Sequence, residues 1–112
     1  MESTLKIVCK AVESKLGEDI KIIDLRSVSP FIDYFLICSA NNQRHANAII
    51  DEVLDKAKEN NIDFNIVHNS NESLWLIADL NSVVCHVFVG DERQKYNLEG
   101  LWKDLPLIDV NN

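Results

Sequence analysis

The sequence predicts a single domain of the α/β or α+β class, built on a mixed five-stranded sheet with flanking helices. Its 112 residues suit one domain with one core. Helix-like and strand-like hydrophobic patterns follow one another in the order α-β-β-α-β-β-β-α. The helix between strands predicts a crossover connection, and the last two strands predict an antiparallel hairpin. Glycine and proline number only 3 and 2, which leaves little of the chain for irregular loops.

Helical periodicity marks three segments of the chain. Apolar spacing predicts a first helix over 3–17 and a short last one over 91–102. Between them, Asn41 or Asn42 can cap a long helix that runs to about residue 60. The apolar stripe of this long helix is the strongest periodic signal in the chain and consists of Ala46, Ile49, Ile50, Val53, Leu54 and Ala57.

Five further segments have the composition of strands and are 20–25, 32–40, 63–67, 73–79 and 83–89. The segment 32–40 is apolar on both faces over its second half, which favours a central position in the sheet. The last two segments are joined by a turn and are expected to form an antiparallel hairpin.

The hairpin register predicts which side chains share a face. If Leu80-Asn81 is the centre of the turn, Trp75 lies opposite His86. The same register places Ile77 opposite Val84. One face then carries Trp75, Ile77, Val84, His86 and Phe88, and the other carries Leu74, Leu76, Ala78, Val83, Cys85 and Val87. The second face is small and aliphatic, as a core under helices requires, whereas large amphipathic rings like those of the first are favoured at protein interfaces.

Charge and cysteine usage limit the function classes. The net charge is −7 and lysine and arginine do not cluster, which argues against direct binding to DNA or RNA and fits a basic protein as partner. Cys9, Cys38 and Cys85 are scattered and odd in number, so buried thiols in a reducing compartment are expected. No apolar run has the length of a membrane span and no signal region precedes the first helix, so a cytoplasmic protein without a membrane partner is predicted.

Motifs for catalysis or metal binding are missing from the sequence. Cys85 and His86 are adjacent on a strand and point to opposite faces, so they cannot ligate one ion together. No nucleophile elbow, P-loop or dinucleotide fingerprint occurs, and we predict no cofactor and no metal. Asp24, Asp33 and Asp79 lie near strands, which leaves a divergent enzyme using a divalent metal as the alternative.

Three blocks of sequence, in order and at compatible spacing, resemble one known family. The blocks are DLRSVSPFIDYFLICSANNQRHANAI, LWLIADLNSVVCHVF and DERQKYNLEGLW. The positions that carry the resemblance are Asp33, Tyr34, Phe35, Arg44, Trp75, Asp79, Val84, His86, Phe88, Arg93, Tyr96, Leu98, Glu99, Leu101 and Trp102. Together they span about residues 5–105, and the chain is similar to the ribosomal silencing factor (RsfS or Iojap) family. Asn81 stands where that family usually has a turn glycine, and it can adopt a positive φ there.

The resemblance implies a translation regulator that is not an enzyme. Family members bind the large ribosomal subunit through ribosomal protein number fourteen, block joining of the small subunit and repress translation when nutrients are scarce. Their fold is similar to the nucleotidyltransferase fold without its catalytic carboxylates. The partner-binding residues expected here are Trp75, Ile77, Asp79, His86, Phe88, Tyr34, Arg93 and Tyr96. A homodimer of the free protein, formed through the uncovered sheet face, is a further expectation.

Overall fold

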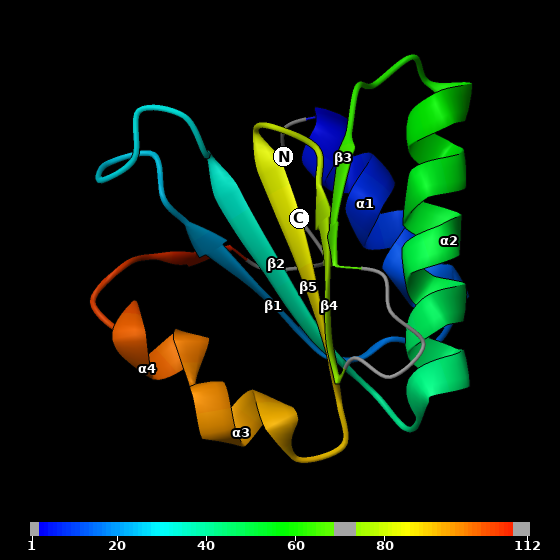
Figure 1. The fold of residues 1–112 in the computed structure, drawn as a ribbon. Helices are drawn as coiled ribbons and strands as arrows, with labels where there is room; N and C mark the ends of the chain where they lie inside the picture. The colour runs from blue at the N-terminus through cyan, green and yellow to red at the C-terminus, as the bar shows by residue number, and fades with distance from the viewer. Residues whose placement is uncertain (1–2, 69–73, 109–112) are drawn as a thin grey trace.

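The computed structural model describes residues 3–68 and 74–108 (Figure 1). It confirms a single α+β domain built on a mixed sheet. In chain order the elements are α1 (Ser3–Ser14), β1 (Glu18–Asp24), β2 (Tyr34–Ala40), α2 (Gln43–Glu59), β3 (Asn65–His68), β4 (Trp75–Asp79), β5 (Val83–Val89), α3 (Glu92–Tyr96), α4 (Leu98–Leu101) and β6 (Leu107–Ile108). The five predicted strands are present, and β6 adds a sixth that the sequence analysis missed.

The strand order is β3-β4-β5-β2-β1-β6, with β2 and β5 side by side at the centre. These two central strands are parallel, and α2, β3 and β4 lie on the connection between them. The other neighbouring strands pair antiparallel. The predicted central position of the second strand is therefore confirmed, since β2 pairs with a neighbour along both of its edges.

The helices form a layer on each side of the sheet. The long helices α1 and α2 lie on one face, and the short helices α3 and α4 lie against the other, near the end of the sheet where β5 leaves it (Figure 1). The face under α1 and α2 carries the larger core, to which β2 contributes Leu36 and Cys38 and β5 contributes Cys85 and Val87. The aliphatic face predicted for the hairpin is therefore core, although Leu74 at its end is exposed.

Helix termini follow local chemistry. Asn42 is the N-cap of α2, and its side chain accepts a hydrogen bond from the backbone N–H of His45 at 2.8 Å, which settles the choice between the two predicted caps. The helix α1 ends at Ser14, earlier than predicted, because Leu16 adopts φ 61°. Gly17 then approaches α1 so closely that a Cβ at this position would collide with a methyl carbon of Val12.

The turn between β4 and β5 sits one residue later than predicted. Leu80 N–H donates to the carbonyl of Val83 at 2.9 Å, so Asn81 and Ser82 form the centre of the turn. Asn81 has φ 67°, which confirms its expected positive φ, and its N–H donates to Oδ1 of Asp79. This shift moves every cross-strand pair by two residues, and the predicted pairing was wrong.

In the observed register Trp75 lies opposite Phe88 and Ile77 lies opposite His86. A shift of two residues leaves each side chain on its predicted face, since the strand period is two. Trp75, Ile77, His86 and Phe88 therefore share one face as expected.

The C-terminal segment returns to the edge of the sheet. Asn97 has φ 48° and separates α3 from α4, so the predicted last helix is broken in two. The carbonyl of Pro106 accepts a hydrogen bond from Asp24 N–H at 2.9 Å, and β6 then pairs with β1. A strand of two residues, one exposed and one half-buried, shows no alternation that a sequence pattern could detect.

Candidate protein-docking site

The face of the sheet opposite α1 and α2 carries a second apolar cluster. Its buried members are Ile23, Leu25, Ile37 and Phe88, and its partly buried members are Ile32, Phe35, Trp75, Leu98, Trp102 and Leu105. The last three come from α4 and the segment after it, so the described part of the C-terminal segment covers part of this face, while Trp75 stays partly exposed. We call Phe35, Trp75, His86, Phe88 and Tyr96 the aromatic face.

Trp75 lies at the centre of the aromatic face. Its ring is stacked on Phe88 with centroids 5.1 Å apart, and Tyr96 from α3 lies 4.5 Å away on a tilted plane. Trp75 and Tyr96 therefore meet although they come from a strand and a helix that are distant in the sequence. Ring pairs at such distances contribute beyond the area that they bury. Trp75 remains half-buried and Tyr96 is 52% exposed, so both rings reach the surface.

His86 is buried beneath this surface, with 5% of its area exposed. Its Nδ1 accepts a hydrogen bond from Trp75 Nε1 at 3.1 Å, and the Phe35 ring meets it edge-on at 4.5 Å. Because Nδ1 accepts, the imidazole is neutral with its proton on Nε2, which has no hydrogen-bond partner among the described residues. Burial lowers the pKa of His86 to about 4. The histidine therefore holds the indole of Trp75 in place as a neutral acceptor.

The structure brings together most of the residues that the sequence predicted for partner binding. Trp75, Ile77, His86 and Phe88 lie side by side, and Tyr96 joins them from α3. Of these, Trp75, Ile77 and Tyr96 reach solvent. Phe88 and His86 are buried, so in this conformation they can support a partner contact but cannot make one.

The remaining predicted residues lie apart from the aromatic face. Tyr34 is buried on the other face of β2, within the core under the long helices, and the Arg26 guanidinium lies 5.3 Å from its ring centroid. Asp79 is half-buried at the end of β4, where its carboxylate caps the hairpin turn. Arg93 is buried among polar groups at the opposite end of the sheet. Direct contact with a partner is open to Asp79 but not to Tyr34 or Arg93.

Arg93 of α3 makes internal contacts with three separate elements. Its Nε donates to Oε1 of Glu99 at 2.6 Å, and its Nη1 donates to Oγ of Ser39 at 3.0 Å. The same Nη1 lies 3.7 Å from Oδ2 of Asp19. These contacts join the C-terminal segment to the start of β1 and the end of β2.

The sequence analysis missed several side chains of this face. Phe35 and Ile32 contribute to it, but a strand that is apolar on both faces gives no signal for choosing which side chains point to which side. Phe31, in the loop before β2, is 84% exposed. Ser29 Oγ accepts hydrogen bonds from the N–H groups of Phe31 and Ile32 in this loop.

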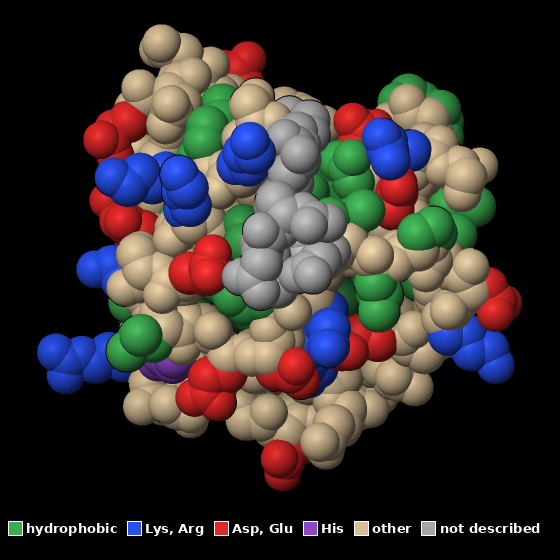
Figure 2. Space-filling model, turned by 180° about the vertical axis from the view of Figure 1, so that it is seen from behind, with side chains coloured by type: hydrophobic (Ala, Val, Ile, Leu, Met, Phe, Trp, Pro, Cys, Tyr) green, Lys and Arg blue, Asp and Glu red, His purple; other side chains and the backbone are tan. Residues whose placement is uncertain are grey.

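Charged side chains of both signs lie on the face of the molecule that is seen from behind (Figure 2). The view from behind shows acidic and basic side chains interspersed, with hydrophobic side chains exposed in small patches between them (Figure 2). Asp24, at the end of β1, accepts two hydrogen bonds from the Arg26 guanidinium at 3.0 and 2.8 Å, which lowers the pKa of its carboxyl group. The described residues hold no group of three histidine, cysteine, aspartate or glutamate side chains that could bind a metal ion.

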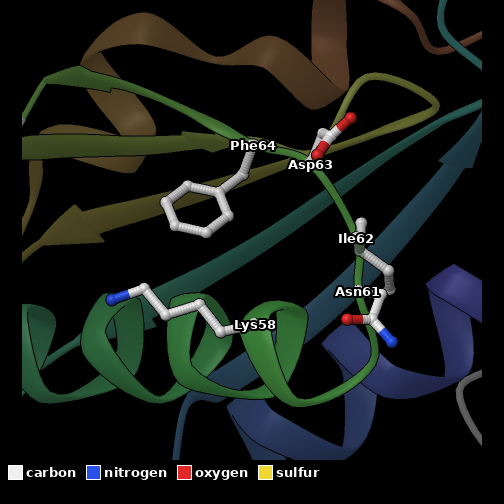
Figure 3. Close-up of a pocket in the computed structure, with 5 residues that line it drawn as sticks. All are labelled: Lys58, Asn61, Ile62, Asp63 and Phe64. Atoms are coloured by element: carbon white, nitrogen blue, oxygen red, sulfur yellow. The ribbon is translucent and has the colours of Figure 1, made fainter.

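A wide hollow of about 510 Å³ lies beside the end of α2 (Figure 3). Lys58, Asn61, Ile62, Asp63 and Phe64 line it, and the Lys58 ammonium lies 5.9 Å from the Phe64 ring centroid.

The fold and the aromatic face define a small α+β domain with a partly exposed cluster of rings on one face of its sheet. Among the described residues, no helix combines the length and the apolar character of a membrane span. The family model "Ribosomal silencing factor during starvation" matches residues 1–112, and the chain belongs to this family.

Known relatives match this chain over most of its length. The ribosomal silencing factor RsfS of Bacillus subtilis is 44% identical over 110 residues, which cover 98% of this chain and 93% of that protein. A crystal structure from Bacillus halodurans superposes with a TM-score of 0.85 at 33% identity, covering 97% of this chain and 99% of the other. A mouse protein named mitochondrial assembly of ribosomal large subunit protein 1 is 28% identical over 89 residues, which cover 77% of this chain and 39% of that protein.

Proposed function

We propose that this protein binds the large ribosomal subunit through ribosomal protein number fourteen and blocks joining of the small subunit. It acts in the cytoplasm, without catalysis, and lowers translation when nutrients are scarce. The family membership supports a silencing role, and the names of the relatives point to the ribosome and its large subunit. The observation that carries the docking site is the half-open aromatic face around Trp75.

The chemistry of this face suits a protein partner. Trp75 and Tyr96 present wide rings at the surface, and Ile77 adds an aliphatic side chain next to them. Tryptophan and tyrosine at the centre of an interface carry a large share of its binding energy, because they bury wide rings at a small cost in side-chain entropy. Buried Phe88 and His86 fix the indole from below, so the surface is formed before a partner arrives.

Net charge favours the same class of partner. The chain carries −7, and ribosomal proteins are generally basic, so opposite fields speed their encounter. The open face can also accept a second copy of the free protein, which would then compete with the subunit. Analytical ultracentrifugation of the free protein, in the absence of ribosomes, measures whether such a dimer forms.

The enzymatic alternative has less support. Asp24 is held by the Arg26 guanidinium, and Asp79 caps the turn between β4 and β5. Both carboxylates therefore have structural roles that the fold needs. A turnover assay with nucleoside triphosphates and a divalent metal addresses this alternative directly.

Sedimentation of the protein with purified large subunits, followed by addition of small subunits, tests the proposal. The expected results are stoichiometric binding and loss of joined ribosomes without nucleotide hydrolysis. Trp75→Glu should leave a cooperatively folded protein, because the half-buried position gives the new carboxylate access to water. It should weaken binding by about thirtyfold or more, the loss that corresponds to truncating a hot-spot residue.

Leu16→Glu is the matched control. It introduces the same charge at an exposed apolar side chain beside α1, away from the aromatic face, and should bind as the wild type does. A Trp75→Glu variant that stays folded and still binds would show that the docking surface lies elsewhere. Inhibition of joining that requires nucleotide turnover would support the enzyme instead.

A further inference from the structure

The C-terminal segment that carries Tyr96 has little stability of its own. It leaves the sheet at Gly90, which turns the chain at φ 59°, and continues as α3 and α4, with 5 and 4 residues. Helices this short do not form in isolation, because nucleation costs more than so few hydrogen bonds return. The position of Tyr96 over Trp75 must therefore come from contacts between this segment and the sheet.

Arg93 supplies charged contacts of this kind. Its side chain is only 8% exposed, and Glu99, Ser39 and Asp19 surround it. Ser39 belongs to β2 and Asp19 to β1, so the guanidinium joins the segment to two strands at once. Arginine suits this place because its planar fork can donate to several acceptors in fixed directions.

The backbone of β1 is shaped toward this contact. Asp19 has φ 49°, a conformation unusual for a residue with a side chain, and the pairing of β1 with β2 shifts register between Glu18 and Lys21. Irregularities of this type redirect a side chain at the edge of a sheet. Here the carboxylate of Asp19 lies 3.7 Å from Arg93 Nη1.

One helical turn separates Arg93 from Tyr96. The Arg93 carbonyl accepts a hydrogen bond from Asn97 N–H at 2.9 Å, which closes that turn. Arg93 points toward the start of β1 and the end of β2, while Tyr96 points to the indole of Trp75. A side chain fixed at one end of so short a helix determines where the other end lies.

We propose that Arg93 is a positioning residue, which holds α3 against the sheet so that Tyr96 completes the docking surface with Trp75. This inference rests on the proposed function for its binding consequence. It replaces a partner contact at Arg93 with an internal role, because the guanidinium is buried and its hydrogen-bond partners belong to this chain.

Hydrogen–deuterium exchange and binding to purified large subunits test the proposal in Arg93→Ala. The variant should fold, since Glu99 and Asp19 lie near enough to solvent to be hydrated. Amides of residues 92–101 should exchange at least about tenfold faster, while those of β2 and β5 exchange as in the wild type. Lys95→Ala removes the same charge from an exposed position on the same helix and should change neither measurement.

A double-mutant cycle with Tyr96→Ala distinguishes positioning from general support. If Arg93 acts through Tyr96, the double variant binds no more weakly than Tyr96→Ala alone. Fully additive losses, or unchanged exchange in 92–101, would overturn the proposal. Should Arg93→Ala fail to fold, Glu99→Gln and Arg93→Lys apply the same criteria, because each weakens the network while keeping a hydrogen-bonding group in place.

The binding measurement tests the proposed function, and the exchange measurement tests the role of Arg93 separately. If wild-type protein does not bind large subunits, the proposed function is wrong. The exchange comparison, together with nuclear Overhauser contacts between the rings of Tyr96 and Trp75, still decides whether Arg93 positions Tyr96. Loss of those ring contacts in Arg93→Ala but not in Lys95→Ala is the expected result, and their retention would overturn it.

Discussion

Trp75 donates a hydrogen bond through Nε1 to Nδ1 of His86 at 3.1 Å, although the two residues are not opposite each other in the sheet. Ile77 lies opposite His86, and Trp75 reaches the imidazole along the diagonal between neighbouring strands. His86 therefore has a structural role in its buried strand. It accepts a hydrogen bond from the Trp75 indole and so fixes the orientation of that ring. The neutral imidazole also avoids placing a charge beneath the rings.

Removing this hydrogen bond should destabilise the fold. Trp75→Phe keeps a ring over Phe88 but leaves His86 Nδ1 without its donor, which costs about 1–3 kcal/mol for a buried polar atom. The free energy of unfolding in urea measures the loss. Trp102→Phe, which removes another half-buried indole on the same side of the sheet, is the control and should cost less.

The double variant Trp75→Phe/His86→Phe sharpens this test. Removing both polar partners leaves no unsatisfied imidazole, so the double variant should recover part of the stability lost in Trp75→Phe. A double variant that loses the sum of the two single effects would contradict a role for the hydrogen bond.

The free energy of unfolding should decrease as pH is lowered, because of His86. Its folded pKa is about 4, against 6.5 for the unfolded histidine, so the unfolded state binds the proton first as pH falls. This contribution is fully present above about pH 6.5 and is lost progressively as pH falls to about 4. The loss reaches about 3 kcal/mol for this shift. Urea unfolding at several pH values measures the decline.

His86→Gln should reduce the decline between pH 6.5 and 4. His45→Gln removes a different histidine, near the start of α2, and serves as the control variant. The lowered pKa of Asp24, whose usual value is 3.8, adds a further loss that begins at about pH 5 and continues below about pH 4. An unchanged pH profile in His86→Gln would show that the imidazole is not held neutral by burial.

The sequence was sufficient for the faces of the hairpin but not for its register. Period-two alternation assigns Trp75, His86 and Phe88 to one face, and this assignment survives a shift of two residues. The register depends on whether Asn81 takes a positive φ as the first or the second central residue of the turn, which composition does not determine. The paired positions were therefore wrong although the face was right.

The covering of the aromatic face depends on long-range contacts. A charged residue in a short amphipathic segment is expected to be solvated, yet Arg93 is buried because acceptors from β1, β2 and α4 converge on it. Neither the bend at Asn97 nor the pairing of β6 with β1 has a periodic signal. The sequence could therefore predict rings on this face, but not which of them stay at the surface.

The three cysteines should be inert in the native protein. All are buried free thiols, as the sequence predicted. Burial raises the pKa of Cys9 and Cys38 to about 12, with Glu13 adding to the effect at Cys9, and raises that of Cys85 as well. Because the thiolate is the nucleophile, alkylation by iodoacetamide at pH 8 should be slower than for an unperturbed thiol by roughly a thousandfold.

Mass spectrometry of the alkylated protein measures this difference. The same protein in concentrated urea is the control and should take up three labels at the rate of free cysteine. Rapid labelling of any one cysteine under native conditions would mean that its part of the core opens far more readily than the packing under α1 and α2 implies.

Binding to the large subunit should be assisted by charge but held by the aromatic face. The net charge of −7 raises the association rate toward a basic protein, and salt above about 0.15 M screens that attraction beyond roughly 8 Å. Dissociation should depend little on salt, because Trp75 and Tyr96 contribute through ring burial. Surface plasmon resonance with immobilised large subunits separates the two rates.

Trp75→Phe should change dissociation and leave the salt dependence of association as it is. A log–log slope of affinity against salt of roughly −5 or steeper is the signature of displacing counterions from many phosphates, and would identify ribosomal RNA as the main contact.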